Sequence, residues 1–178
     1  MRDQTSLLPA LARGSLEVII GQLESLEDQI GGLERHIHVE HRSNEASRRL
    51  QTIPGIGVIG ATAIAATVTD PKVFKSGREF AAWIGLVPRQ NSTGGMERLG
   101  SISKQGDRYL RRQLVVGATA VIRQARAHPE RYPWLIQLLA RRPTKVVAVA
   151  LANKTARIAW AVLAKGEIYR TSALVARA

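Results

Sequence analysis

The chain has 178 residues, of which 45% are hydrophobic and only 4% aromatic, and it contains no cysteine. This length and composition indicate one packed domain with at most an appendage, and they exclude disulfides and thiolate metal sites within the chain. The formal net charge of +12 favours nucleic acid as a partner over the alternative of a domain that is merely basic.

The charge is divided unevenly along the chain. Residues 1–50 carry a net charge of −2, and residues 51–178 carry +14. The start of the chain lacks the apolar segment of a signal peptide, and we identify no stretch of about 20 apolar residues that could span a bilayer. We therefore expect a cytoplasmic protein, associated with the bacterial nucleoid and without a membrane partner.

Residues 1–49 contain one long predicted helix. Its apolar residues recur at alternating spacings of three and four, as at the a and d positions of a coiled coil: Leu16, Ile19, Leu23, Leu26, Ile30, Leu33 and Ile37. Acidic residues occupy most of the other faces. We predict that this segment is a coiled coil through which the chain self-associates as a dimer or tetramer. A helix that packs on its own domain is the alternative.

Residues 50–178 are predicted to form a helical DNA-binding domain, which opens with LQTIPGIGVIGATAIAATV (residues 50–68). Pro54 ends one helix, Gly55 and Gly57 allow a tight turn, and an apolar helix begins near Val58. This order predicts a helix-hairpin-helix, whose glycines and free helix N–H groups approach a phosphate without reading bases. A plain helix-turn-helix inside a core would have the same pattern.

Three further helices have recognisable starts. Ser76 and Glu79 form a capping box before a short helix, Asp107 caps a helix that runs from Arg108 to about Arg126, and Pro143 precedes a last helix that ends at Gly166. Strand signals are weak throughout. We predict an all-α fold: a coiled-coil helix, then a helical domain with a helix-hairpin-helix and an active-site loop rich in Gly, Ser and Arg.

That loop runs from Pro88 to Gly106 and contains NSTGG at residues 91–95. A hydroxyl beside Gly94 and Gly95, surrounded by cations, suits attack on a phosphodiester, because the cations neutralise the phosphoryl group in the transition state. From these residues alone, a loop that only holds phosphate is an equal alternative. The predicted cations are Arg89, Arg98, Lys104, Arg108, Arg111 and Arg112.

Other enzyme sites are not expected in this chain. Three of the four histidines lie in the predicted coil, so a Ser-His-Asp triad has little to draw on. The six carboxylates of residues 51–178 are scattered along the sequence, so we expect no metal site built from them.

Three segments also carry a family resemblance: LQTIPGIGVIGATAIAATV, FKSGREFAAWIGLVPRQNSTGG and RLGSISKQGDRYLRRQLVVGA. Together they resemble the C-terminal transposase domain of the IS110/IS1111 insertion-sequence family. The resemblance implies DNA recombination guided by a bridging non-coding RNA. It also implies a serine nucleophile in this domain, which forms a covalent 5′-phosphoserine link to a cut strand.

The same resemblance implies an N-terminal RuvC-like domain with an Asp-Glu-Asp-Asp metal site, and nothing in this chain matches that half. We therefore expect the chain to be the C-terminal half of a longer transposase. Divalent metal (Mg) is expected only in the missing N-terminal domain, and no cofactor in this chain.

The family's serine precedes a glycine, and NSTGG offers Ser92 and Thr93 at adjacent positions. Counting forward from Pro88 favours Thr93, but a primary hydroxyl is less hindered than a β-branched one, so we predict that Ser92 is catalytic. Ser101 and Ser103 are predicted to cap a helix or bind phosphate. Two alternative functions are a non-catalytic helix-hairpin-helix nucleic-acid-binding module and an interaction protein that inhibits a full-length relative through the coil.

Overall fold

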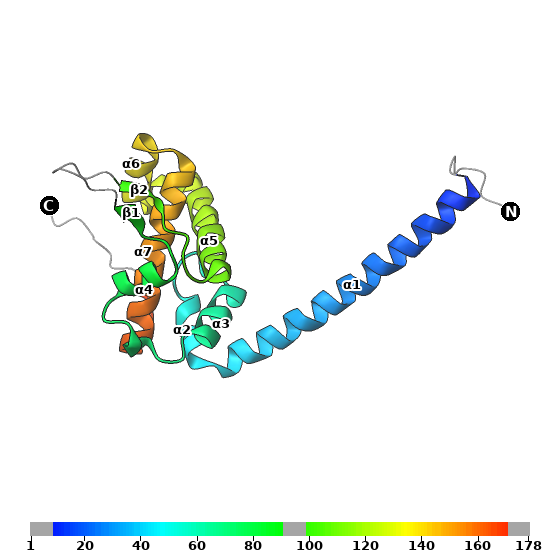
Figure 1. Cartoon of the computed structure of the whole chain (residues 1–178), viewed down its shortest axis with the longest axis horizontal. Coiled ribbons are helices and arrows are strands. Elements are labelled where there is room, and N and C mark those ends of the chain that lie inside the picture. The colour runs from blue at the N-terminus through cyan, green and yellow to red at the C-terminus, as the bar shows by residue number, and fades with distance from the viewer. Residues whose placement is uncertain (1–8, 91–98, 171–178) are drawn as a thin grey trace. The chain divides into compact units, whose positions relative to one another are not determined.

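The computed structural model describes residues 9–90 and 99–170 (Figure 1). These residues are helical apart from one two-stranded sheet, so the predicted all-α class is confirmed. The chain divides into two units, Met1–Val39 and Glu40–Ala178. The domain boundary expected at residues 49 and 50 stays a prediction.

The first unit consists of α1 (Ala10–Ser43), which continues to its end in the second unit. Its a and d residues are exposed, with between 42% and 63% of each side chain accessible from Leu16 to Leu33. An apolar stripe of this length in water is unfavourable unless another surface covers it. The structure of one chain leaves the predicted self-association as a proposal.

The second unit contains six α-helices within the described residues, and α7 is its central element. They are α2 (Glu45–Gln51), α3 (Val58–Thr67), α4 (Gly77–Trp83), α5 (Arg108–Ala127), α6 (Pro133–Arg141) and α7 (Thr144–Lys165). Two short 3-10 helices, η1 (Pro71–Val73) and η2 (Pro129–Arg131), precede α4 and α6. Both α5 and α4 pack against α7, as Figure 1 shows.

Side-chain caps explain where several of these helices begin. Asp107 Oδ1 accepts a hydrogen bond from the Leu110 N–H at 2.8 Å, and Ser76 Oγ accepts one from the Glu79 N–H at 3.3 Å. The expected start of each helix is confirmed. Gly166, in the left-handed conformation at φ 68°, ends α7 as expected.

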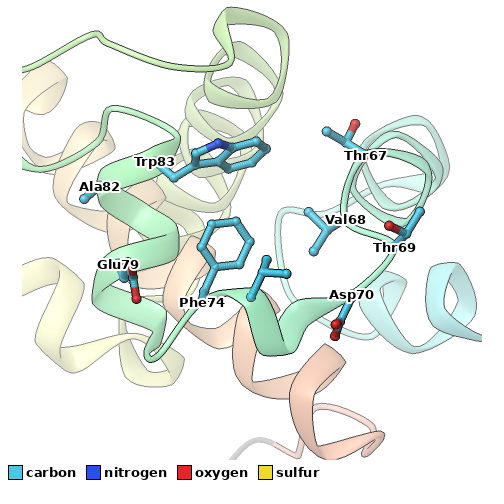
Figure 2. Close-up of a pocket in the computed structure, with 9 residues that line it drawn as sticks. Thr67, Val68, Thr69, Asp70, Phe74, Glu79, Ala82 and Trp83 are labelled. Carbon is cyan, nitrogen blue, oxygen red and sulfur yellow. The ribbon is translucent and has the colours of Figure 1, made fainter.

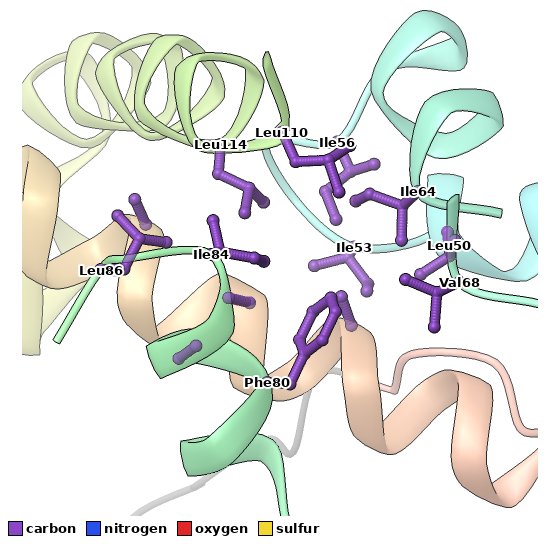
Figure 3. Packing of buried hydrophobic residues seen from close by; sticks show 14 of the residues in the cluster. Leu50, Ile53, Ile56, Ile64, Val68, Phe80, Ile84, Leu86, Leu110 and Leu114 are labelled. Carbon is purple, nitrogen blue, oxygen red and sulfur yellow. The ribbon is translucent and has the colours of Figure 1, made fainter. Parts of the chain in front are cut away.

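The main core lies where α2, α3, α4, α5 and α7 meet (Figure 3). Large aliphatic side chains surround one aromatic residue, Phe80, and α7 contributes Ala152, Ala156 and Ala159, which are all fully buried. Because alanine is small, the neighbouring helices can approach the α7 backbone closely. A chain with few aromatic residues therefore builds its core from aliphatic side chains and close helix packing.

Within the part of the chain that the structure describes, α7 is the one helix long and apolar enough to cross a membrane by length and composition. The search for apolar stretches in the sequence did not identify it. Core helices satisfy the same criterion, and the buried residues of α7 pack inside the domain.

Candidate nucleic-acid interface

The predicted active-site loop contains a small β-hairpin. β1 (Pro88–Gln90) pairs with β2 (Leu99–Ile102) in an antiparallel arrangement, with Pro88 opposite Ile102 and Gln90 opposite Leu99. We expected an irregular loop over these residues. Strands of three and four residues, with a proline and an irregular register, are too short to produce a recognisable alternation of apolar and polar residues.

In the sequence, the segment from residue 91 to residue 98 lies between β1 and β2. Ser92, Thr93, Gly94, Gly95 and Arg98 all belong to this segment and lie outside the described residues. Since Gln90 pairs with Leu99, the residues that flank the segment are held beside each other.

Arg89 and Lys104 come from opposite sides of the hairpin. Arg89 Nη2 donates a hydrogen bond to the Ser103 carbonyl oxygen at 3.2 Å, and the Ser103 N–H donates to the Val87 carbonyl oxygen at 3.0 Å. The guanidinium of Arg89 therefore lies beside the residue that precedes Lys104. Both cationic side chains are exposed.

The chain turns sharply between β2 and α5. Lys104 has φ 56°, and among the described residues no other non-glycine residue has a positive φ. A left-handed backbone is costly for a residue with a Cβ, so the surrounding packing must hold it. The Lys104 N–H donates a hydrogen bond to the Gly85 carbonyl oxygen at 3.2 Å, and two residues on, Gly106 at φ 101° lies so close to α4 that a Cβ there would overlap the Trp83 carbonyl oxygen.

The three predicted arginines of α5 have different environments. Arg108 and Arg112 are four residues apart on one exposed helix face, and neither has a hydrogen bond or ion pair within the described residues. Arg111 is partly buried, and its Nη1 donates to the Ile84 carbonyl oxygen at 2.8 Å. The structure leaves Arg108 and Arg112 available to an anion and gives Arg111 a role in packing.

Ser101 is exposed and lines a cavity of about 560 Å³ between the hairpin and α7. The other walls are mainly apolar, with Lys145 at the N-terminal end of α7. Neither Ser101 nor Ser103 caps a helix. Of the two roles predicted for these serines, phosphate binding remains as a proposal.

The turn between α2 and α3 uses its two predicted glycines differently. Gly55 has φ 89°, and a Cβ there would lie 3.0 Å from both the Gly117 carbonyl oxygen and Val121 Cγ2. Gly57 is the N-cap of α3, and a Cβ there would meet nothing within 4 Å. Gly55 is thus explained by packing against α5, and Gly57 has open space in front of it.

His41 is buried, although from the sequence it was assigned only to the predicted coil. Its Nδ1 is 2.7 Å from Ser47 Oγ and its Nε2 is 2.8 Å from Gln51 Oε1; Ser47 Oγ is also 3.2 Å from Thr62 Oγ1. These bonds connect the last turn of α1, which belongs to the second unit, to α2 and α3. Asn44, which caps α2, was the available signal that a new helix begins there.

Few carboxylates neutralise the cations of the second unit. Over residues 9–90 and 99–170, the ion pairs within 4.0 Å are Arg49 with Glu45, and Glu130 with both His128 and Arg131. The remaining described cations have no such partner. The described part of the second unit therefore keeps the net positive charge that attracts polyanions.

A cavity of about 600 Å³ lies between Phe74, Trp83 and Val68 (Figure 2). Asp70 and Glu79 also line it, and their carboxylates accept hydrogen bonds from the backbone N–H groups of Lys72 and Lys75. Two carboxylates and no lining cation repel a phosphate. We exclude this cavity as a nucleic-acid site.

The described residues include no group of three His, Cys, Asp or Glu side chains that could hold a metal ion. The family resemblance implies its divalent metal in an N-terminal domain that this chain does not match, so the metal remains a proposal for the complete transposase. We derive no chemical step through such a metal.

Comparisons with known proteins agree on one family. Residues 47–133 match the family model described as Transposase IS116/IS110/IS902 family. The chain is 50% identical over 171 residues to a probable family 20 transposase of Pseudomonas aeruginosa, covering 96% of this chain and 51% of that protein.

Two further relatives have similar coverage. The chain is 48% identical over 165 residues to a putative transposase of Sinorhizobium fredii, covering 92% of this chain and 43% of the relative. It is 38% identical over 172 residues to the transposase for insertion sequence element IS1111A of Coxiella burnetii, covering 96% and 47%. The chain spans about half the length of these curated relatives.

Proposed function

Because the chain belongs, through residues 47–133, to the IS116/IS110/IS902 family of transposases, we propose that it is the DNA-recombining part of an insertion-sequence transposase. In this proposal it binds DNA and supplies Ser92 as the nucleophile for strand cleavage and transfer. The observation that supports the proposal is the hairpin, in which Gln90 and Leu99, the residues on either side of the segment with Ser92, pair with each other, together with exposed cations that have no ion pair among the described residues.

Four cations between β1 and the second turn of α5 support phosphate binding. Arg89 lies on β1, Lys104 in the turn after β2, and Arg108 and Arg112 on the first two turns of α5. Arginine forms bidentate hydrogen bonds with phosphate, and unpaired cations lose no existing ion pair when they bind it. We propose that these residues hold the backbone of the DNA at the cleavage position, with Arg98, Gly94 and Gly95 from the adjoining segment.

The proposed chemistry is a transesterification at phosphorus. Ser92 Oγ attacks the phosphodiester, the Oγ–P bond forms, the P–O3′ bond breaks, and the leaving 3′ oxygen gains a proton to become a hydroxyl. The proton lost from Ser92 passes to solvent or to a base of the complete transposase. Attack of a 3′ hydroxyl from a second strand on the phosphoserine reverses the step and joins the strands, so no external energy source is required.

Charge on the equatorial phosphoryl oxygens increases in the transition state of each step. Preorganised guanidinium and ammonium groups stabilise that charge more than they stabilise the ground state, which is how they would accelerate the reaction. We assign this role to the four described cations and Arg98.

A second DNA contact is proposed at Gly57. Backbone N–H groups at the start of α3 have no helical acceptor, and the space in front of Gly57 is open. A phosphate bound there would be contacted without regard to sequence.

Four further parts of the proposal concern the complete protein. We propose that a bridging RNA guides target choice, that the α1 stripe mediates assembly, and that Mg²⁺ acts only in the half of the transposase that this chain does not contain. We also propose that the protein acts in the bacterial cytoplasm, at the nucleoid, where its DNA is located. The resemblance supports the RNA and the metal, and the exposed a and d residues support the assembly.

The proposal is tested first by binding of the 178-residue chain to labelled duplex DNA at increasing salt. The expected log affinity falls with log salt with a slope of about −0.9 per phosphate contacted. An affinity that does not change with salt would contradict the proposal. If the chain binds but a complete transposase works without Ser92 or Thr93, the non-catalytic module is the correct alternative.

A further inference from the structure

A second basic groove runs along α7, outside the hairpin site. It has a volume of about 700 Å³ and lies between the start of α4 and the start of α6. Three of its residues are cationic and two are tryptophans: Arg78, Lys154, Arg157, Trp134 and Trp160. No acidic side chain is among the described residues that line it.

We propose that this groove binds an unpaired stretch of nucleic acid, with one base stacked on Trp134 and the neighbouring phosphates held by Arg78, Lys154 and Arg157. The inference deepens the proposed function and rests on it, because it adds a single-strand site to a chain that handles nucleic acid.

Trp134 has the features of a stacking platform. Its side chain is 45% exposed, and its indole N–H has no acceptor in the described part of the chain. Lys154 Nζ lies over one face of the ring, 4.2 Å from its centroid, so the proposed base stacks on the other face. Exposed aromatic rings beside cations bind single-stranded nucleic acid by base stacking.

Trp160, the other tryptophan of the groove, differs from Trp134 because its indole N–H is bonded and its ring is less accessible. Its Nε1 donates a hydrogen bond to the Pro71 carbonyl oxygen at 3.0 Å, and its ring is partly buried. This tryptophan fixes η1 against α7 and forms a wall of the groove. Trp134 also lines an adjacent hollow of about 410 Å³, so there is open space beside its ring.

The three cations of the groove lie close together and have no ion pair with a described carboxylate. Lys154 and Arg157 are three residues apart, which puts them on one face of α7 at about 4.5 Å along its axis. Arg78 is held close to them, because a Cβ on Gly77 would lie 2.9 Å from the Arg157 carbonyl oxygen, so α4 packs directly on the α7 backbone. None of the three cations has an ion pair with a described carboxylate.

The choice of occupant follows from the combination of these groups. Duplex DNA keeps its base faces stacked and offers Trp134 no partner. An acidic peptide would use the cations but leave the exposed indole without a function. An unpaired nucleotide uses both, whether it belongs to RNA or to a separated DNA strand.

The test measures fluorescence anisotropy of a labelled oligonucleotide of about 10 nucleotides, within the site sizes of about 4–16 nucleotides found for single-strand binders. RNA, single-stranded DNA and duplex DNA of the same sequence are compared with the full chain. Trp134→Ala should weaken binding of the single strands about 5- to 100-fold, as expected when one base can no longer stack on an aromatic ring. Trp134→Phe should restore most of the affinity, and duplex affinity should not change.

Matched charge variants separate this groove from the general positive charge. Lys154→Ala with Arg157→Ala should weaken single-strand binding and lower its salt slope by about 0.7 for each phosphate that the variant no longer neutralises. Lys72→Ala with Lys75→Ala removes the same charge outside the groove, from exposed positions, and should have a much smaller effect. A circular-dichroism melt establishes that each variant is folded, and the charge pair decides the question if Trp134→Ala is not.

Each comparison between nucleic acids or variants has an outcome that supports or overturns the inference. Tighter binding of RNA or of DNA identifies the source of the strand. Unchanged single-strand affinity in the folded groove variants, or an equal loss of duplex affinity, overturns the inference. If the groove variants change the oligomeric mass of the chain but not its affinity for single strands, the inference is also overturned, because the groove would then be a contact between proteins. If the unaltered chain binds duplex but no single strand, only the groove inference fails; if it binds neither, the proposed function fails as well.

Discussion

Gly55 and Gly117 bring the turn between α2 and α3 into direct backbone contact with α5. A Cβ on Gly55 would lie 3.0 Å from the Gly117 carbonyl oxygen, and a Cβ on Gly117 would overlap the Gly55 carbonyl oxygen. This contact fixes the start of α3, and with it the proposed phosphate contact at Gly57, relative to the helix that carries Arg108 and Arg112.

The contact predicts that Gly117→Ala destabilises the domain by about 1–3 kcal/mol, the usual cost of overpacking a close contact. Gly60→Ala is the matched control, because Gly60 is also inside a helix but a Cβ there meets its nearest atom at 3.8 Å. That variant should be neutral or stabilised by up to about 1 kcal/mol through helix propensity. Chemical denaturation measures both, and equal stabilities would contradict the packing argument.

The exposed Arg112 and the partly buried Arg111 of α5 should affect different properties when each is replaced by alanine. Arg112→Ala should weaken duplex binding and reduce the salt slope by about 0.9, because one phosphate is no longer neutralised, with stability unchanged. Arg111→Ala should lower stability, since its guanidinium donates to the Ile84 carbonyl oxygen. Binding titrations and denaturation curves on the same samples separate the two. A stable Arg111→Ala variant with a large binding defect would reverse this assignment.

The sequence predicted the elements whose causes are local. Asp107, Ser76 and Gly166 mark helix ends through bonds or backbone angles within a few residues, and these positions were predicted correctly. Gly117 gave no such signal, because its role depends on Gly55, which is distant in the sequence. A contact between distant segments leaves no periodicity that sequence analysis can detect.

The features of the candidate site that depend on local sequence were predicted, and those that depend on tertiary packing were not. The composition of residues 88–112 identified the cationic region, but the bond from Arg111 to Ile84 and the pairing of β1 with β2 depend on tertiary packing. Trp134 and Lys154 were also missed as a pair, since they lie on different helices.

The His41 network predicts that Ser47→Ala lowers stability by about 1–3 kcal/mol, because it leaves a buried ring nitrogen without its partner. Ser43→Ala is the control: its hydroxyl is exposed and bonds only to the Glu40 carbonyl oxygen. Thermal unfolding should show a clear loss for the first variant and almost none for the second. Equal melting temperatures would show that the network does not stabilise the fold.

The exposed stripe of α1 predicts self-association of the whole chain. Replacing Leu26 and Ile30 with glutamate should reduce the oligomeric mass in sedimentation, because charges at the a and d positions cannot be buried. Replacing Val18 and Ser25 with glutamate adds the same charge at c positions, away from the seam, and should leave the mass unchanged. A monomeric unaltered chain would refute the coiled-coil proposal.

The proposed covalent bond between Ser92 and DNA can be trapped and located. A complete transposase that carries this domain is incubated with a nicked or phosphorothiolate-containing duplex, and the attached nucleotide is located by peptide mapping. We predict that the label is found on Ser92. The Ser92→Ala variant should form no adduct but bind DNA almost normally, because the cations hold the phosphate and only the hydroxyl reacts. Label on Thr93 would show that the neighbouring hydroxyl is the nucleophile. Full strand transfer by a Ser92→Ala, Thr93→Val double variant would show that the nucleophile is not in this segment.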